Sequence, residues 1–396
     1  MLILILNSGS SSIKFQLMQM PDEKILSSGL IERIGAENSK FKYQNDSAMI
    51  DEERQVETHL AGLEMIAKLL LDPVKGNISK AEEIYAIGHR VVHGGNSFRD
   101  TTLITPEVKE TIKKLNVLAP LHNPHNLAGI EVAENLFPKA KQVAVFDTAF
   151  HQTIPTKARK YGIPNAFFEE KRIQLYGFHG TSHKYVTQRT NKYFGEIIEN
   201  VISIHLGNGC SITAVKNGNS IDHSLGFAPS NGLIMGTRSG DIDHSIIFYM
   251  VRTLGYELDE VEKLLNSKSG MLGLSGYSDL RDIQMAALEG DAHCLMALEM
   301  NAYRIKKYIG SYTAILNGLD TLIFTAGIGE NSSMLREMIC SDLTFLGIVL
   351  DTRKNDLNNS GIREIQSDSS KVKILVVPTN EELEIAKQGY ELLKED

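Results

Sequence analysis

The sequence predicts an α/β protein built from two duplicated domains with a cleft between them. Its 396 residues exceed what one ordinary hydrophobic core organises and correspond to roughly two domains. Apolar runs typical of strands alternate with segments of helical periodicity along the chain. The stretch ILNSGSSSI, residues 5–13, also has a counterpart half a chain length later in HLGNGCSIT, residues 205–213, where Leu6, Gly9 and Ser11 match Leu206, Gly209 and Ser211.

The first half begins with the apolar run LILIL, which enters a turn of Asn, Gly and Ser residues and resumes as IKFQLM. Two strand-like runs around small residues predict a β-hairpin whose tip a ligand can approach closely. Beyond it we expect a helix over 60–71, a buried strand ending in glycines within EIYAIGHRVVHGG, residues 83–95, and another strand in KQVAVFDTAF, residues 141–150.

The second half repeats this order. The hairpin around 205–213 leads to a further turn signal at Asn217 and Gly218. A long amphipathic helix is predicted over 293–316, and then a strand and a glycine turn in TLIFTAG, residues 321–327. Residues 373–393 predict a strand, a turn and a final helix. No charged or low-complexity linker separates the halves, so we expect closely packed domains.

Composition excludes several classes of function. With 42% hydrophobic and 23% charged residues, the chain is typical of soluble globular proteins. The net charge of -8 includes no basic block, so we expect no nucleic-acid partner and no membrane surface. No apolar run reaches about 18 residues, and LILIL is too short for a signal-peptide core. Three widely spaced cysteines, Cys210, Cys294 and Cys340, favour reduced thiols and a cytoplasmic protein.

Three glycine-rich turns follow apolar strands: NSGSSS from Asn7, GNGCS from Gly207 and TAGIGENSS from Thr325. Such turns present backbone N–H groups to phosphates without side-chain crowding. One such turn alone is more often explained by the steric needs of a hairpin, but three together favour nucleotide binding. The P-loop pattern GxxxxGK[ST] is absent, so we expect paired hairpins to hold the nucleotide. Lys14 follows the first turn, where it would reach phosphates, although a solvated strand lysine is the simpler interpretation.

Polar side chains also stand at strand ends and turns: Arg90, His122, Asp147, His179 and Arg238. Arginine binds two phosphate oxygens at once through a permanently charged fork, although a single arginine is more often a salt-bridge partner. The pairs His122/His125 and His179/His183 have a spacing that zinc uses, but no HExxH pattern or cysteine pair accompanies them. Asp147 and Glu381 are oxygen ligands of the kind that magnesium binds through water.

At these residues the sequence resembles the acetokinase family, within the superfamily of actin, sugar kinases and Hsp70. The resemblance rests on NSGSSSIKF, GHRVVHGG, APLHNPHNL, FDTAFHQTIP, YGFHGTSHKYV, HLGNGCSI, GLIMGTRSGDID, FTAGIGENS and PTNEELEIA, in the family's order from Asn7 to Ala386. It implies a duplicated actin-like (ribonuclease H-like) two-domain fold with an interdomain cleft. The implied domains are residues 1–147, joined by the final helix 382–396, and residues 148–381, which bind the nucleotide.

The resemblance implies reversible transfer of a phosphoryl group from ATP to acetate, giving acetyl phosphate and ADP, with Mg²⁺ or Mn²⁺ and in a homodimer. It assigns Asn7 and Glu381 to the metal, Arg90 to the carboxylate, Asp147 to the catalytic centre, and His179 and Arg238 to the transferring phosphoryl group. His122 joins the substrate site. The implied nucleotide site consists of Lys14, His205, Leu206, Gly207, Asn208, Gly209, Asp279, Leu280, Arg281, Gly327, Ile328, Gly329, Glu330 and Asn331.

Physical chemistry supports most of these roles and qualifies one. A transferring phosphoryl group spreads negative charge over three oxygens, which arginines, a histidine donor and magnesium stabilise. A carboxylic acid substrate is already ionised near pH 7, since its pKa is roughly that of Glu. No proton needs removing, so we expect Asp147 to orient an arginine or metal-bound water. The family's small apolar pocket corresponds to Val92, Leu121, Phe178 and Pro229, and Val92 favours acetate over propionate.

The sequence departs from the family's usual residues around one loop, at His223, Ala228, Ser230 and Asn231, and again at Cys210 and His244. Position 223 is more often Thr in the family. Two other functions remain open: a kinase for propionate or another short-chain fatty acid, and a nucleotide-switched binding protein on the same fold. The arginines Arg90 and Arg238 together with His179 count against the switch, which has no need of them.

Overall fold

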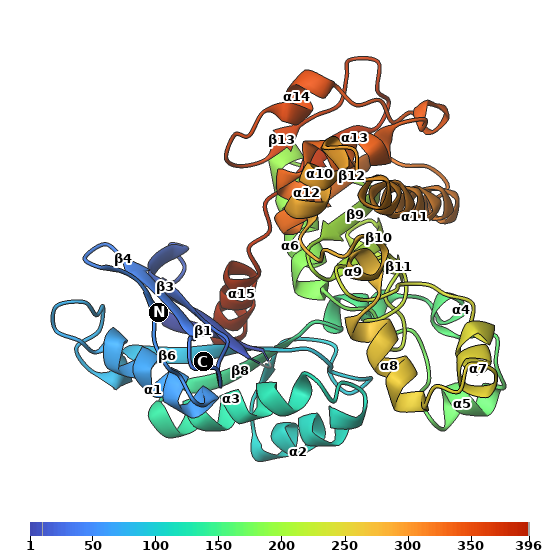
Figure 1. The fold of residues 1–396 in the computed structure, drawn as a ribbon. Coiled ribbons are helices and arrows are strands. Elements are labelled where there is room, and N and C mark those ends of the chain that lie inside the picture. Colours follow the sequence, from blue (N-terminus) through green and yellow to red (C-terminus); the bar gives the residue numbers. More distant parts are fainter. Residues whose placement is uncertain (10, 395–396) are drawn as a thin grey trace. The chain divides into compact units, whose positions relative to one another are not determined.

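The protein is described by a computed structural model over residues 1–9 and 11–394. It divides into two compact units: unit 1 consists of Met1–Phe150 and Asn380–Asp396, and unit 2 of His151–Thr379 (Figure 1). The domain limits expected from the sequence, after residues 147 and 381, stay predictions. The chain passes from unit 1 to unit 2 between residues 150 and 151 and returns to unit 1 between residues 379 and 380. Glu381 therefore belongs to unit 1.

Unit 1 contains an eight-stranded sheet in the order β5-β4-β3-β2-β1-β6-β8-β7. Its first five strands form an antiparallel meander, β6 and β8 run parallel to β1, and β7 is antiparallel to β8. The strands are β1 (Leu2–Ser8), β2 (Ser12–Gln19), β3 (Lys24–Glu32), β4 (Lys40–Asn45), β5 (Met49–Glu53), β6 (Ile84–Val91), β7 (Thr102–Leu103) and β8 (Lys141–Phe146). The helices are α1 (His59–Leu70), α2 (Pro106–Lys114), α3 (Asn123–Leu136) and α15 (Glu381–Leu393).

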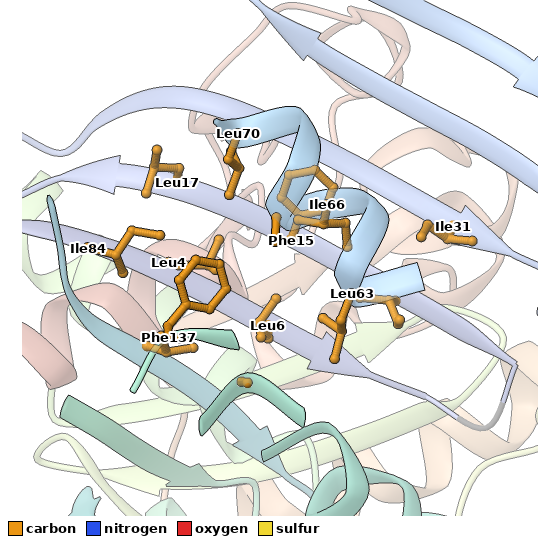
Figure 2. Close-up of a cluster of buried hydrophobic side chains, with 14 of the residues drawn as sticks. Leu4, Leu6, Phe15, Leu17, Ile31, Leu63, Ile66, Leu70, Ile84 and Phe137 are labelled. Carbon is orange, nitrogen blue, oxygen red and sulfur yellow. The ribbon is translucent and has the colours of Figure 1, made fainter. Parts of the chain in front are cut away.

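The run LILIL is buried over Ile3–Leu6 because both faces of β1 are covered. Leu4 and Leu6 pack into a core with Leu63 and Ile66 of α1 and with Phe137, the residue that follows α3 (Figure 2). Helix α15 packs against β1, β6 and β8. A methyl group at Gly88 of β6 would lie 2.7 Å from Cγ2 of Ile385, so this glycine allows α15 to approach the sheet closely.

Unit 2 contains a six-stranded sheet in the order β11-β10-β9-β12-β14-β13. Its strands are β9 (Asn200–Leu206), β10 (Cys210–Lys216), β11 (Asn219–His223), β12 (Thr321–Thr325), β13 (Arg363–Glu364) and β14 (Lys373–Val376). Its helices are α4 (Thr156–Arg159), α5 (Asn165–Glu169), α6 (Gly180–Phe194), α7 (Ser245–Arg252), α8 (Leu258–Ser267), α9 (Gly270–Ser275), α10 (Leu280–Leu288), α11 (Ala292–Leu316), α12 (Ala326–Asn331), α13 (Ser333–Cys340) and α14 (Thr352–Asp356).

The two sheets share one topology, which explains the internal sequence repeat. In each, a three-stranded antiparallel meander (β1–β3 and β9–β11) is followed by two parallel strands (β6 and β8, β12 and β14) and a short antiparallel edge strand. The two predicted hairpins, β1–β2 and β9–β10, therefore occupy equivalent positions. The predicted Asn-Gly turn is also confirmed, because Asn217 and Gly218 both have positive φ between β10 and β11.

One predicted element is wrong. The stretch TAGIGENSS was expected to form a glycine turn, but β12 continues directly into α12. Gly329 of α12 lies against β9, with the position of a methyl group 3.8 Å from Cβ of Leu206. The segment therefore forms a short helix that packs on the sheet instead of a turn. The glycines were misread because glycine in sequence is typical of turns.

Candidate active site

Unit 1 brings Arg90 and Asp147 together at the ends of two neighbouring parallel strands. Arg90 lies in β6, and Asp147 follows β8 and donates its backbone N–H to Val91. The Arg90 Nε donates to both carboxylate oxygens of Asp147 at 3.0 Å, and Nη2 donates to Oδ2 at 2.6 Å. Asp147 is 1% exposed, so this bidentate pair fixes the plane of the guanidinium.

Glu381, the first residue of α15, lies beside this pair, with Oε2 3.9 Å from Nε of Arg90. Burial raises the pKa of Glu381, and the charge of Asp147 adds to this effect while Arg90 opposes it. Burial alone would lower the pKa of Arg90, but Asp147 and Glu381 outweigh it and raise that pKa. The cluster therefore keeps one permanent cation among carboxylates.

Asn7 completes this group from the end of β1, where Oδ1 accepts from Nη1 of Arg90 at 3.5 Å. No set of three or more His, Cys, Asp or Glu side chains that could hold a metal ion occurs within residues 1–9 and 11–394. Asn7 and Glu381 do supply the hard oxygen donors that magnesium prefers. They fit an ion that takes its remaining ligands from water and phosphate.

Sequence reasoning missed Glu382. Its Oε1 lies 2.8 Å from Nζ of Lys14 in unit 1, and the expected role of Lys14 at the nucleotide stays a prediction. The Glu382 side chain is 5% exposed, so Lys14 compensates a buried charge. The only sequence signal was the adjacency of two glutamates in PTNEELEIA.

Two asparagines of α3, also missed, hold the backbone around this cluster. Asn126 accepts from the N–H of Val92 and donates to the carbonyl of Ser8, which ties β6 to the first hairpin. Asn123 accepts from the N–H of His93 and donates to its carbonyl. His122 immediately precedes α3, Val92 is half-buried, and Leu121 is exposed.

Unit 2 gathers His179 and Arg238 at the second hairpin. A methyl group at Gly209 would lie 3.4 Å from Cε1 and Nε2 of His179 and 4.0 Å from Nη1 of Arg238. Both side chains therefore border the same small space beside the turn between β9 and β10. His179 precedes α6 with a φ of 55°, a left-handed conformation that is uncommon for a residue with a side chain. Its ring stacks on His205 with centroids 4.4 Å apart.

Arg238 is a cation without a carboxylate partner among the described residues. Its Nη1 donates to the carbonyl of Pro229 at 2.7 Å. Burial lowers the pKa of Arg238, but the group stays charged because its ordinary pKa is far above neutrality. A half-buried guanidinium satisfied by a carbonyl retains free N–H groups for an anion.

A narrow hollow of about 10 Å³ lies between three of the predicted nucleotide stretches of unit 2. Its lining includes Leu206 and Gly207 of the hairpin, Leu280 of α10 and Ile328 of α12. Asp279 and Arg281 do not line it, because they pair with each other at 2.6 Å. The Glu330 carboxylate accepts from the N–H of Thr379 at 3.0 Å. Three of the predicted segments thus meet at one hollow.

Two of the predicted apolar residues also lie in unit 2. Phe178 is 1% exposed, and its carbonyl accepts from Nε2 of His151. Pro229 is half-buried, and its carbonyl accepts a hydrogen bond from Nη1 of Arg238. Phe178 and Pro229 thus belong to unit 2, whereas Val92 and Leu121 belong to unit 1.

The histidine pairs that could have suggested zinc have other partners. Both ring nitrogens of His183 lie next to serine hydroxyls, Ser203 at 2.9 Å and Ser211 at 2.8 Å. His125 stacks on His59 with centroids 5.7 Å apart. The three cysteines are buried and free.

The model of the Acetokinase family matches residues 2–387. The chain belongs to the acetokinase family. It is 59% identical, over the full length of both chains, to acetate kinase from Flavobacterium johnsoniae. It is 49% identical to acetate kinase from Thermotoga maritima, over 100% of this chain and 99% of the other. The crystal structure of Porphyromonas gingivalis acetate kinase superposes with a TM-score of 0.93 at 42% identity, over 99% of each chain.

Membership of the acetokinase family makes this chain a kinase, a phosphotransferase that binds a nucleotide. It also confirms the predicted two-domain actin-like α/β fold. Within the described residues, no helix is both long and apolar enough to cross a lipid bilayer.

For an acetokinase with this geometry, Gly209→Ala is expected to raise the KM for ATP about 10-fold or more. The added methyl group enters the space that His179 and Arg238 border, while contacts of 3.4 Å and longer leave the fold intact. Steady-state kinetics and thermal unfolding test this. Gly310→Ala on α11, where a methyl group meets nothing within 4 Å, is the matched control and should change neither quantity. An unaltered KM for ATP in Gly209→Ala would show that no phosphate comes near this turn.

Proposed function

We propose that this acetokinase transfers the γ-phosphoryl group of ATP directly to acetate, reversibly, giving acetyl phosphate and ADP. The observation that carries the proposal is the 59% identity to an acetate kinase over the full length of both chains. The geometry supports it, because unit 1 has an oriented arginine among carboxylates. Beside a glycine turn, unit 2 has a histidine and a guanidinium with no carboxylate partner among the described residues.

In this proposal Arg90 binds the acetate carboxylate and Asp147 fixes the orientation of Arg90. The substrate carboxylate is already ionised near neutral pH and attacks without losing a proton. His179 and Arg238 donate to the oxygens of the transferring phosphoryl group, where charge accumulates in the transition state. Leu206, Gly207 and Ile328, which border one narrow hollow, belong to the segments that bind ATP in this proposal.

Magnesium is the proposed cofactor, with Asn7 and Glu381 as its protein ligands and manganese as a possible replacement. When bound, it neutralises charge on the phosphates. Lys14 and Glu382 pair next to these residues, so we propose that Lys14 sets the charge balance around Glu381 and does not contact the nucleoside. We also propose a cytoplasmic location, on the basis of the composition and the free cysteines.

The kcat/KM values for acetate, propionate and butyrate with MgATP test this function, with the acyl phosphate trapped as a hydroxamate. We expect acetate-dependent ATP consumption and the highest value for acetate. Slow ATP hydrolysis that does not respond to any of the acids would instead indicate a nucleotide switch.

A propionate kinase is the second candidate. A propionate kinase from Francisella tularensis superposes with a TM-score of 0.92 at 43% identity, over 98% of each chain. Since one methylene changes binding by only about 1–3 kcal/mol, propionate should be a poorer substrate but still react.

We expect Val92→Ala to narrow the ratio of kcat/KM between acetate and propionate. The half-buried Val92 follows β6 directly after Arg90 and Val91, so a smaller side chain leaves room for the extra methylene. The ratio from parallel assays is the measurement, and Val117→Ala, an exposed valine of unit 1, is the control. If the acetate-to-propionate ratio of kcat/KM stays the same in Val92→Ala, Val92 does not line the substrate pocket.

We also propose a homodimer formed through α7. This helix exposes a contiguous apolar surface in unit 2, with Ile246, Phe248 and Tyr249 at 43%, 52% and 57% exposure. Large apolar surfaces of this kind mark protein interfaces. Tyr249→Glu is expected to shift the mass measured by light scattering from two chains to one. Leu288→Glu on α10, equally apolar and 78% exposed, should leave the mass unchanged. A dimer that persists in Tyr249→Glu would place the interface elsewhere.

A further inference from the structure

A chain of four polar side chains runs from His179 into the interior of unit 2. Nδ1 of His179 lies 2.9 Å from Oγ of Ser211, and the same hydroxyl lies 2.8 Å from Nε2 of His183. Nδ1 of His183 lies 2.9 Å from Oγ of Ser203. Ser203, His183 and Ser211 are fully buried, so solvent water does not reach these three side chains.

The secondary structure explains why these groups meet. His179 and His183 are four residues apart at the start of α6, and the N–H of His183 donates to the carbonyl of His179. Ser203 in β9 pairs with Thr213 in β10, so Ser203 and Ser211 lie on the same face of the sheet. Helix α6 packs on β9 and places its two histidines over this polar face.

Counting protons limits the possible arrangements. The Ser211 hydroxyl carries one proton, and its side-chain partners among the described residues are the two ring nitrogens. To use that proton it donates to one ring, and it then accepts from the other. When it donates to Nδ1 of His179, the proton of His183 must be on Nε2. Nδ1 of His183 then accepts from Ser203. Burial holds the pKa of His183 far below its usual value, so this ring is neutral and carries a single proton.

This arrangement leaves His179 with its proton on Nε2, the atom that borders the space beside Gly209. The reversed arrangement places the proton on Nδ1 and turns a lone pair toward that space. Only an N–H at Nε2 donates to a phosphoryl oxygen while the ring is neutral.

We infer that His183 is a positioning residue which, through Ser211, holds His179 in the tautomer with its proton on Nε2. The inference rests on the proposed role of His179 as a donor to the phosphoryl group. His183 itself does not touch substrate. Its contribution is to decide which ring nitrogen of His179 is protonated before ATP binds.

Long-range ¹H–¹⁵N correlation spectra of enzyme labelled at histidine report the tautomer directly, with His179→Gln used to assign the signals. We expect the Nε2–H form in the wild-type enzyme and a mixture of tautomers in Ser211→Ala. The kcat of Ser211→Ala should fall about 10- to 100-fold, less than the loss of a whole oxyanion donor, with a smaller change in the KM for ATP. His183→Gln retains an amide N–H for Ser211 and should keep both the tautomer and most of the kcat.

Ser220→Ala is the matched control. Ser220 also bonds a buried histidine, His151, at 2.9 Å in unit 2, but it is outside the chain that leads to His179. Ser220→Ala should lose about as much stability as Ser211→Ala, while the tautomer of His179 stays unchanged. An Nε2–H signal that persists in Ser211→Ala with normal kcat would overturn the inference. If His179→Gln retains full activity, the proposed function of His179 fails, whereas the tautomer spectra still test the role of His183.

Discussion

Asp147→Asn is expected to lower kcat by at least about 100-fold and to raise the KM for acetate. The carboxylate accepts three hydrogen bonds from Arg90, and an amide replaces one of its oxygens with an N–H group that opposes the guanidinium. Arg90 is then free to turn toward Glu381, 3.9 Å away, and no longer presents its fork to the substrate. Initial rates with varied acetate, together with a magnesium titration, measure the effect.

Glu134→Gln provides the control for this substitution. Glu134 pairs with Lys109 at 2.6 Å in the same unit, so the change also removes one carboxylate from an ion pair. We expect its kinetics to match the wild-type enzyme. Near-normal turnover in Asp147→Asn, with unchanged affinity for magnesium, would contradict the orienting role of Asp147.

Acid should destabilise this protein steeply below about pH 6.5, the ordinary pKa of histidine. Burial lowers the pKa of His89 and His93 to about 4 and that of His151 to about 3, and it holds His183 and His223 well below the usual value. The unfolded chain therefore binds more protons than the folded one as the pH falls from 6.5. At pH 5 each such group lowers the free energy of unfolding by about 2 kcal/mol. Thermal or urea unfolding between pH 7.5 and 5 measures this.

His223→Thr tests one member of this set, because the family more often has Thr at this position. His223 lies 4.1 Å from His151 between ring centroids, and its Nε2 is buried without a hydrogen-bond partner among the described residues. Removing it should make the loss of stability at pH 5 smaller by about 2 kcal/mol. His293→Gln, at an exposed position, should leave the pH dependence as it was. An equally steep acid transition in His223→Thr would mean that His223 is protonated in the folded protein.

Local sequence patterns predicted much of the fold, since hairpins and the Asn-Gly turn are encoded within a few residues. The long helix α11 and the strand-turn-helix at the end of the chain follow from periodicity for the same reason. The glycines of α12 were misread as a turn, because the helix that contains them packs against β9, more than a hundred residues away in the sequence.

The candidate site could likewise be predicted only where local sequence patterns reveal its residues. Arg90 and Asp147 could be found because Arg90 lies near the end of an apolar strand and Asp147 directly follows another, each within a distinctive motif. The pairing of Lys14 with Glu382, and of Ser203 and Ser211 with His183, joins segments that share no local pattern. Only the register of β9 and β10 and the packing of α15 on the first sheet bring them together.

The division of unit 1 between the two ends of the chain has a consequence for biosynthesis. Its sheet is complete by residue 146, but α15, which covers β1, β6 and β8, begins only at Glu381. Translation must therefore finish unit 2 before the ribosome releases the helix that carries Glu381 and Glu382. Until then one face of the first sheet stays uncovered and Arg90 lacks two of its acidic neighbours.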